Sequence, residues 1–187
     1  LNLKKLNLIK LNNKSINLIN VDYNVKKPFE KISNKSNQYI KKSFDLAFKI
    51  LKRGITNKFI NGPISKKHFL PKKYPGMTEY ISEKFSVKNN AMLIYNKKLS
   101  ICPVTTHLPI KHVSKQINKK IIFNKVYLIN SFYKKTIGFK PKIGVLGLNP
   151  HCESIDNFNE DEKIIFPAIN HLKKLKLKVS GPYSADT

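Results

Sequence analysis

Apolar stretches typical of β-strands alternate with amphipathic helical stretches, and this alternation limits the possible folds more than any other feature of the chain. Residues 142–148, KIGVLGL, form an apolar run typical of a buried strand. Residues 159–175 have helical spacing of apolar side chains, and 178–181 begin another strand-like segment. Pro167 lies beyond the first turn of that helix and predicts a kink or a restart there. This order favours a layered α/β architecture, in which ligands gather at the carboxyl ends of strands.

The earlier segments continue the alternation. Apolar residues recur at helical spacing between Ser36 and Arg53, with Ser36 as the expected N-cap and Gly54 as the expected stop. Thr78 is the expected N-cap of a short helix that ends at Phe85. The remaining expected elements are strands at 16–21, 58–61, 91–95 and 99–104, and helices at 64–70 and 110–137, the last broken near Asn118.

The charge of the chain is strongly positive, at +25 over 187 residues. Among the 36 basic residues only Arg53 is an arginine, and the lysines are spread along the whole chain. Proteins that recognise nucleic acid rely on the arginine fork, so this pattern favours solvated lysine-rich faces and argues against a nucleic-acid partner. The same charge can attract an anionic substrate.

Other totals restrict the compartment and the class of protein. Hydrophobic residues make up 41% of the chain, which is enough for a packed core. No run of 18 apolar residues and no secretory signal occurs, so neither a membrane span nor export is expected. Cys102 and Cys152 form no CxxC pair, which favours a reducing cytoplasm, and Cys152 is open to either packing or metal ligation. Because the chain begins with Leu1 and ends soon after a strand-like segment, we expect it to be the central part of a longer protein.

Two histidines follow apolar runs. His107 ends the run that begins at Leu99, His151 follows 142–148, and each is close to a proline. Imidazole is a common ligand of transition metals, but catalytic zinc usually takes three protein ligands. The pair therefore indicates half of a metal site, or two histidines that satisfy turn hydrogen bonds. No GxGxxG, P-loop or GxSxG motif occurs, and the remaining histidines, His68, His112 and His171, are expected to have surface or packing roles.

Several short motifs resemble one enzyme family in both content and order. They are Asn61-Gly-Pro-Ile-Ser-Lys, Pro75-Gly-Met-Thr-Glu-Tyr, Ala91-Met-Leu, Val104-Thr-Thr-His-Leu-Pro, Gly147-Leu-Asn-Pro-His and Gly181-Pro-Tyr-Ser-Ala-Asp-Thr. This set is similar to the 4-hydroxythreonine-4-phosphate dehydrogenases of pyridoxal phosphate biosynthesis, from about Ser36 to Thr187. The resemblance implies a fold like that of isocitrate and isopropylmalate dehydrogenases, incomplete within residues 1–187. That fold binds NAD without a glycine fingerprint.

The resemblance also implies the site. Family members are homodimers with the active site at the subunit interface, and a divalent metal is held by three histidines. His107 and His151 match two of these ligands, and the third lies in a His-Asp-Gln segment that this chain does not reach. The softness of three imidazoles suits zinc or cobalt better than magnesium. Thr78 and Met77 match the substrate-binding pair, but Met77 replaces the family histidine, and residues 152–156 depart from the family's glycine-rich loop.

The implied reaction is NAD-dependent oxidation of 4-phosphooxy-L-threonine, followed by decarboxylation to 3-amino-2-oxopropyl phosphate. In that reaction the metal acts as a Lewis acid and NAD accepts the hydride. The individual catalytic and cofactor-binding residues are not indicated. Two alternatives stay open: a related dehydrogenase acting on another phosphorylated hydroxy acid, prompted by Met77, and a non-catalytic lysine-rich module that binds anions or nucleic acid.

Overall fold

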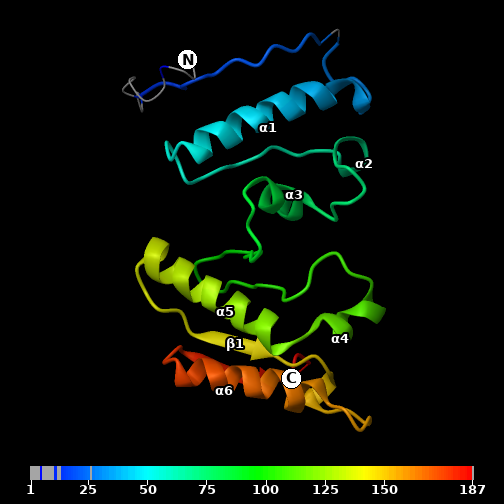
Figure 1. The fold of residues 1–187 in the computed structure, drawn as a ribbon, viewed down its shortest axis with the longest axis vertical. Coiled ribbons are helices and arrows are strands. Elements are labelled where there is room, and N and C mark those ends of the chain that lie inside the picture. Colours follow the sequence, from blue (N-terminus) through cyan, green and yellow to red (C-terminus); the bar gives the residue numbers. More distant parts are fainter. Residues whose placement is uncertain (1–4, 6–10, 12–13, 26, 187) are drawn as a thin grey trace. The chain divides into compact units, whose positions relative to one another are not determined.

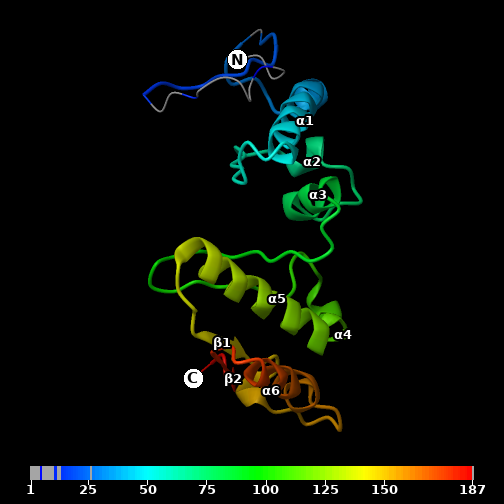
Figure 2. The same cartoon turned by 60° about the vertical axis from the view of Figure 1, so that its left-hand side comes forward.

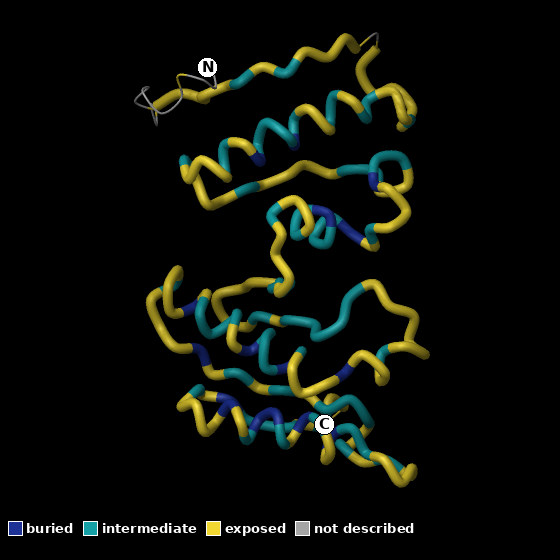
Figure 3. The backbone as a smooth tube through the Cα atoms, in the orientation of Figure 1, coloured by how far each residue is buried: buried dark blue, intermediate teal, exposed yellow. Residues whose placement is uncertain are grey.

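A computed structural model describes residues 5, 11, 14–25 and 27–186. The chain divides into two compact units, Leu1–Lys84 and Phe85–Thr187. Each unit has its own buried residues (Figure 3). None of the helices in the described ranges is both long enough and apolar enough to cross a membrane.

The first unit is helical and has an aromatic core. A 3₁₀ turn, Asn34–Ser36, leads into α1 (Asn37–Lys52), and α2 (Lys66–Phe69) and α3 (Met77–Lys84) follow (Figure 1). Phe44 and Phe48 lie one turn apart on α1 and are both buried, and their rings contact those of Phe59, Phe69 and Tyr80. The predicted helical spacing at 36–53 is therefore confirmed, and Gly54, with φ 70°, ends the helix as expected.

The two predicted caps in this unit have different outcomes. Ser36 lies at the N-cap position of α1 as predicted, but it has helical dihedral angles and makes no side-chain capping bond, and the 3₁₀ turn to which it belongs is capped by the hydroxyl of Ser33. Thr78 lies inside α3, which begins at Met77.

Two predicted strands are also absent. Residues 16–21 and 58–61 have no strand structure among the described residues, and Ile16 is 94% exposed. A strand needs regular ladder pairing of its N–H and C=O groups, which a local apolar pattern does not provide by itself.

The second unit contains the sheet. A 3₁₀ turn, Ile110–His112, precedes α4 (Val113–Gln116) and α5 (Lys119–Phe132), which ends in a π-helical turn, Tyr133–Ile137. The predicted break at Asn118 is confirmed, since its extended backbone and its side-chain bond from the Ile121 N–H cap α5. The segments predicted as strands at 91–95 and 99–104 pair only at a single antiparallel bridge, Ile94 with Ile101.

A parallel strand–helix–strand arrangement completes the unit. β1 (Ile143–Leu146) leads through a 3₁₀ turn, Pro150–Cys152, and a π-helical turn, Asp161–Ile165, into α6 (Phe166–Lys174), and β2 (Val179–Tyr183) returns parallel to β1. Figure 1 shows β1 between α5 and α6, and Figure 2 shows β1 and β2 beside α6. The predicted strands at 142–148 and 178–181 are thus confirmed, and so is the mixed α/β class. The restart expected at Pro167 is also present, because this residue has no N–H to continue the preceding turn.

The core of the second unit lies between α5, α6 and β2. Its buried members are Ile117, Ile122, Val126, Ile165, Ala168, Ile169, Leu172 and Val179. Ile169 and Leu172 are both 0% exposed. Ile165 joins this core from the π-helical turn Asp161–Ile165, and Asp161 at the other end of that turn contacts the turn that carries His151.

Candidate metal and substrate site

The turn after β1 presents His151 in an unusual backbone conformation. His151 has φ 55° and ψ 13°, and Cys152 has φ 60°, so two successive non-glycine residues are left-handed. This conformation is disfavoured for residues with a Cβ and persists where surrounding contacts impose it. At the start of the turn, a Cβ added at Gly147 would lie 2.6 Å from the Cys152 sulfur. Glycine is therefore the residue that lets the chain pass so close to itself here.

The carboxylate of Asp161 holds the beginning of this turn. Asp161 is 1% exposed, and its Oδ1 accepts a hydrogen bond from the Leu148 N–H at 2.8 Å. Its Oδ2 accepts from the Asn149 N–H at 3.1 Å and from the Asn149 Nδ2 at 3.0 Å. A buried charge is stable only when such partners replace water, and here the donors come from the turn itself.

Neighbours of Asp161 hold the other parts of the turn. The Asn159 amide donates to the Cys152 carbonyl oxygen at 3.2 Å, and the Asn159 oxygen accepts from the Asp161 N–H at 2.9 Å. The Asn149 amide also donates to the Glu160 carboxylate at 3.1 Å. The residues before and after His151 are therefore tied to one short segment, residues 159–161, at the start of the π-helical turn that precedes α6. The contact of this segment with the turn was not predicted from the sequence.

His151 lies beside a carboxylate from the segment that follows the neighbouring strand. Its Nε2 is 3.4 Å from Oδ2 of Asp186, which follows β2. Asp186 also accepts a hydrogen bond from the Ser184 hydroxyl. This bond and the nearby imidazole hold the pKa of Asp186 below its usual range. The carboxyl ends of two parallel strands thus bring an imidazole and a carboxylate together, as the strand–helix–strand pattern predicted for ligands in general.

His107 lies in a separate segment of the same unit. It is exposed, has φ 57°, and follows the bridge that pairs Ile101 with Ile94. Val104, three residues earlier, packs against the core. His107 therefore resembles His151 in having a left-handed backbone and an exposed ring.

The described residues provide no complete metal site. No group of three or more His, Cys, Asp or Glu side chains within the described ranges is arranged to hold an ion. The contact that the structure gives for His151 is with Asp186, and a shared ion between His107 and His151 stays a prediction. Two exposed imidazoles suit a transition metal as donors, and a third ligand would have to come from outside this set.

Cys152 is better suited to packing than to metal ligation. Partial burial raises the pKa of its thiol, and the nearby carboxylate of Asp161 raises it further. A thiol must lose its proton to bind a metal, so the neutral form is disfavoured as a ligand. Cys152 instead fills the space over Gly147.

The substrate-binding residues expected from the sequence lie in the first unit. Met77 and Thr78 form the first turn of α3, directly after the buried Gly76. The Tyr80 N–H donates to the Gly76 carbonyl oxygen at 3.2 Å, which anchors this turn to the aromatic core. Both side chains are half-buried.

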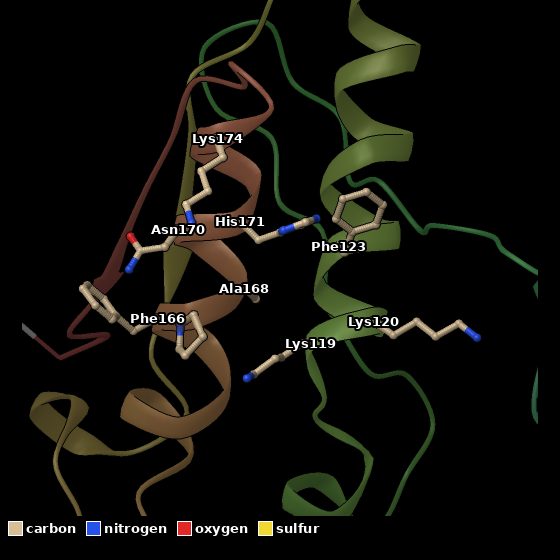
Figure 4. Close-up of a pocket in the computed structure, with 9 residues that line it drawn as sticks. Lys119, Lys120, Phe123, Phe166, Ala168, Asn170, His171 and Lys174 are labelled. Carbon is tan, nitrogen blue, oxygen red and sulfur yellow. The ribbon is translucent and has the colours of Figure 1, made fainter.

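A shallow hollow lies elsewhere on the second unit. Its volume is about 730 Å³, and residues of α5 and α6, including Lys119, Phe123, Phe166 and His171, line it (Figure 4). The His171 ring extends from α6 toward Phe123, with a centroid distance of 5.6 Å, in keeping with the expected packing role. None of the site residues expected from the sequence lines this hollow.

Comparison with known proteins decides the family. The family model described as pyridoxal phosphate biosynthetic protein PdxA matches residues 2–187. The chain belongs to this family. The resemblance seen in the short motifs is thereby confirmed, and the first 30 residues, which carried no motif, are included in the match.

Individual relatives of the PdxA family give the same result. A 4-hydroxythreonine-4-phosphate dehydrogenase of Sulfurihydrogenibium sp. (strain YO3AOP1) is 42% identical over 129 residues, covering 67% of this chain and 40% of the relative. A D-threonate 4-phosphate dehydrogenase of Pectobacterium atrosepticum is 29% identical over 154 residues, covering 76% of this chain and 47% of the relative. The crystal structure of a 4-hydroxythreonine-4-phosphate dehydrogenase from Burkholderia phymatum is similar, with a TM-score of 0.65 and 29% identity over 86% of this chain and 50% of that one. The chain spans about half the length of the relatives it matches.

Proposed function

We propose that the protein is a dehydrogenase that oxidises 4-phosphooxy-L-threonine with NAD and releases carbon dioxide to give 3-amino-2-oxopropyl phosphate. The observation that carries this proposal is the family match along 2–187, together with the Asn-Pro-His turn that presents His151 at the carboxyl end of β1. Relatives named for this activity support it. The proposed setting is the cytoplasm, where the free thiols of Cys102 and Cys152 are stable.

The proposed complete architecture goes beyond the two units described. We expect an isocitrate dehydrogenase-like α/β fold in which residues 1–187 are one part, and a homodimer with the active site at the subunit interface. The sheet, which has two strands within the described ranges, supports this, since a sheet of two strands is marginal alone.

His107 and His151 would hold a divalent metal in this proposal. Their exposed imidazoles fit zinc or cobalt as donors, and a third histidine is expected outside residues 1–187. When bound, such an ion supplies Lewis-acid stabilisation of negative charge on oxygen. Asp186 would hold the His151 ring by its Nε2 side, because a carboxylate beside a ligating histidine fixes the orientation of its ring.

The rest of the proposed chemistry depends on binding and orientation. Thr78 would donate its hydroxyl hydrogen to an anionic group of the substrate from the first turn of α3. Lysine-rich surfaces would raise the local concentration of a phosphorylated substrate.

The direct test is NADH formation by the full-length protein from 4-phosphooxy-L-threonine, with metal content measured on the same samples. His107→Ala and His151→Ala are each expected to lose most of the bound metal and the activity, whereas the matched control His112→Ala is expected to retain both. Metal-free protein with normal activity would refute the metal assignment. Salt-sensitive binding to arbitrary DNA without NADH formation would favour the lysine-rich binding module instead.

A second candidate function rests on Met77. The family histidine at this position is replaced by a thioether, which is only a weak hydrogen-bond acceptor. A relative named D-threonate 4-phosphate dehydrogenase acts on another phosphorylated hydroxy acid. A pocket adapted to such a substrate would explain why the imidazole is missing.

Kinetics of Met77→His separate the two candidates. If 4-phosphooxy-L-threonine is the substrate, an imidazole restores a hydrogen bond to a charged group, worth about 1.5–3 kcal/mol. That corresponds to a gain of roughly 10- to 150-fold in kcat/KM, with metal affinity unchanged because residue 77 does not bind the ion. A lower kcat/KM for this substrate, with D-threonate 4-phosphate preferred by the unmodified protein, would favour the second candidate.

A further inference from the structure

We propose that Asp161 is a positioning residue for His151, fixing the turn from which this histidine would reach the metal. The inference rests on the proposed function, in which His151 is a metal ligand. It concerns how the chain holds that ligand rather than which residues bind the ion.

The burial and the partners of Asp161 carry the argument. Its carboxylate is 1% exposed and accepts three hydrogen bonds, all from Leu148 and Asn149. No lysine, arginine or histidine among the described residues forms an ion pair with it. A buried carboxylate without a cation is costly unless hydrogen bonds replace its water, so Asp161 and the three donors of the turn depend on one another.

The geometry of the donors explains why a carboxylate is needed. Two main-chain N–H groups and one amide N–H point at the same side chain. A carboxylate only accepts hydrogen bonds and can satisfy all three donors. An asparagine of the same shape would direct its own NH₂ group at one or more of them, which leaves donors unpaired and pushes the turn away.

The position of this contact in the chain links it to His151. Asp161 accepts hydrogen bonds from Leu148 and Asn149, which lie three and two positions before His151. Asn159 donates to the carbonyl oxygen of Cys152, which directly follows His151. His151 and Cys152 between these anchors have the left-handed backbone that needs support from outside. Because the anchors surround the strained pair, moving the Asp161 carboxylate is expected to change where the His151 ring points.

The test uses the full-length protein loaded with cobalt(II), whose visible absorption reports the geometry of the ligands. Asp161→Asn is expected to weaken cobalt binding about 10- to 100-fold, the usual effect of losing a residue that orients a ligand, and to alter the absorption band. The matched control is Leu172→Ala, which destabilises the same helix through the core and is expected to leave the band unchanged. An unchanged affinity and band in a folded Asp161→Asn protein would overturn the proposal.

A second variant decides the matter if Asp161→Asn does not fold. Asp161→Glu keeps an acceptor-only carboxylate but adds one methylene, so a smaller loss of affinity and a shifted band are expected. An unchanged band and affinity in this variant would also overturn the proposal.

His151→Ala distinguishes failure of the proposed metal site from failure of the positioning role. If the unmodified protein takes up no cobalt, or if His151→Ala binds it equally well, the proposed metal site fails. If His151→Ala loses cobalt while both Asp161 variants match the unmodified protein, only the positioning role fails.

Discussion

Adding a single methyl group at Gly147 is expected to strain the turn that carries His151. A Cβ at this position would lie 2.6 Å from the Cys152 sulfur and 3.0 Å from Oδ1 of Asp161. Neither neighbour can move freely, because Asp161 accepts three hydrogen bonds and the Cys152 carbonyl is held by Asn159. Gly147→Ala must therefore displace at least one of them.

Two opposing effects determine how much Gly147→Ala lowers the free energy of unfolding. Overpacking by one methyl group typically costs about 1–3 kcal/mol. Replacing glycine by alanine also restricts the unfolded chain, which stabilises the protein by about 0.4–1 kcal/mol where the backbone tolerates a side chain. Gly147 is not among the residues with positive φ, so this gain applies. Taking about 2 kcal/mol for the first effect and about 0.7 kcal/mol for the second leaves a net loss of about 1.3 kcal/mol in the free energy of unfolding.

Urea unfolding of four proteins tests this reasoning: the unmodified protein, Gly147→Ala, Cys152→Ala and the double variant. Removing the Cys152 sulfur relieves the shorter of the two contacts, so Gly147→Ala is expected to cost at least about 0.5 kcal/mol less in the Cys152→Ala background. An equal cost in both backgrounds would show that the sulfur does not limit the space over Gly147. A stabilising effect of Gly147→Ala alone would show that the turn is not tightly packed.

Three further predictions concern stability. Leu172→Ala, at a position 0% exposed, is expected to lower the free energy of unfolding by about 2–5 kcal/mol, whereas Leu175→Ala, at a position 50% exposed, is expected to cost clearly less; urea midpoints compare them. Gly181→Ala is expected to destabilise far more than Gly144→Ala, because Gly181 has φ 118° and its Cβ would lie 2.3 Å from a main-chain oxygen, against 3.5 Å from a tyrosine ring at Gly144. Hydrogen bonds from a tyrosine and a lysine lower the pKa of Glu83, so its stabilisation is present above about pH 4.3 and is lost as pH falls through the folded-state pKa. Unfolding of Glu83→Gln between about pH 5 and pH 3 should therefore depend less on pH than that of the unmodified protein.

The helices could be predicted from sequence because their signals are local. Spacing of apolar residues and the glycine at 54 placed α1 correctly, and Asn118 marked the break before α5 because it caps that helix with its own side chain. Strands depend on a partner that can lie anywhere in the chain. Residues 16–21 and 58–61 have apolar patterns of the right kind, but neither segment is a strand in the described structure, so the local pattern was insufficient.

In the candidate site, too, local features could be predicted from the sequence and contacts between distant residues could not. The placement of His151 after a strand could be read from the sequence, since the apolar run and the Asn-Pro-His turn are contiguous. Its contact with Asp186 depends on the parallel register of β1 and β2, which includes an irregularity between Gly144 and Leu146. The hydrogen bonds of Asp161 reach back 12 and 13 residues, and they form only if the first helical turn is rotated about its axis so that Asp161 faces the His151 turn. The spacing of residues in the sequence does not predict this orientation.

Pro167 accounts for part of this rotation. It has no N–H, so a regular α-helix cannot run unbroken through it, and a π-helical turn, Asp161–Ile165, precedes α6 instead. The Phe166 N–H closes this wider turn by donating to the Asp161 carbonyl oxygen. Asp161 and Ile165 at its two ends are both buried, so the carboxylate faces the His151 turn while the isoleucine joins the core. The same short segment therefore supports both the packing of the unit and the direction of a proposed metal ligand. A loss of metal binding on mutation there is informative only beside a variant, such as Leu172→Ala, that disturbs the packing alone.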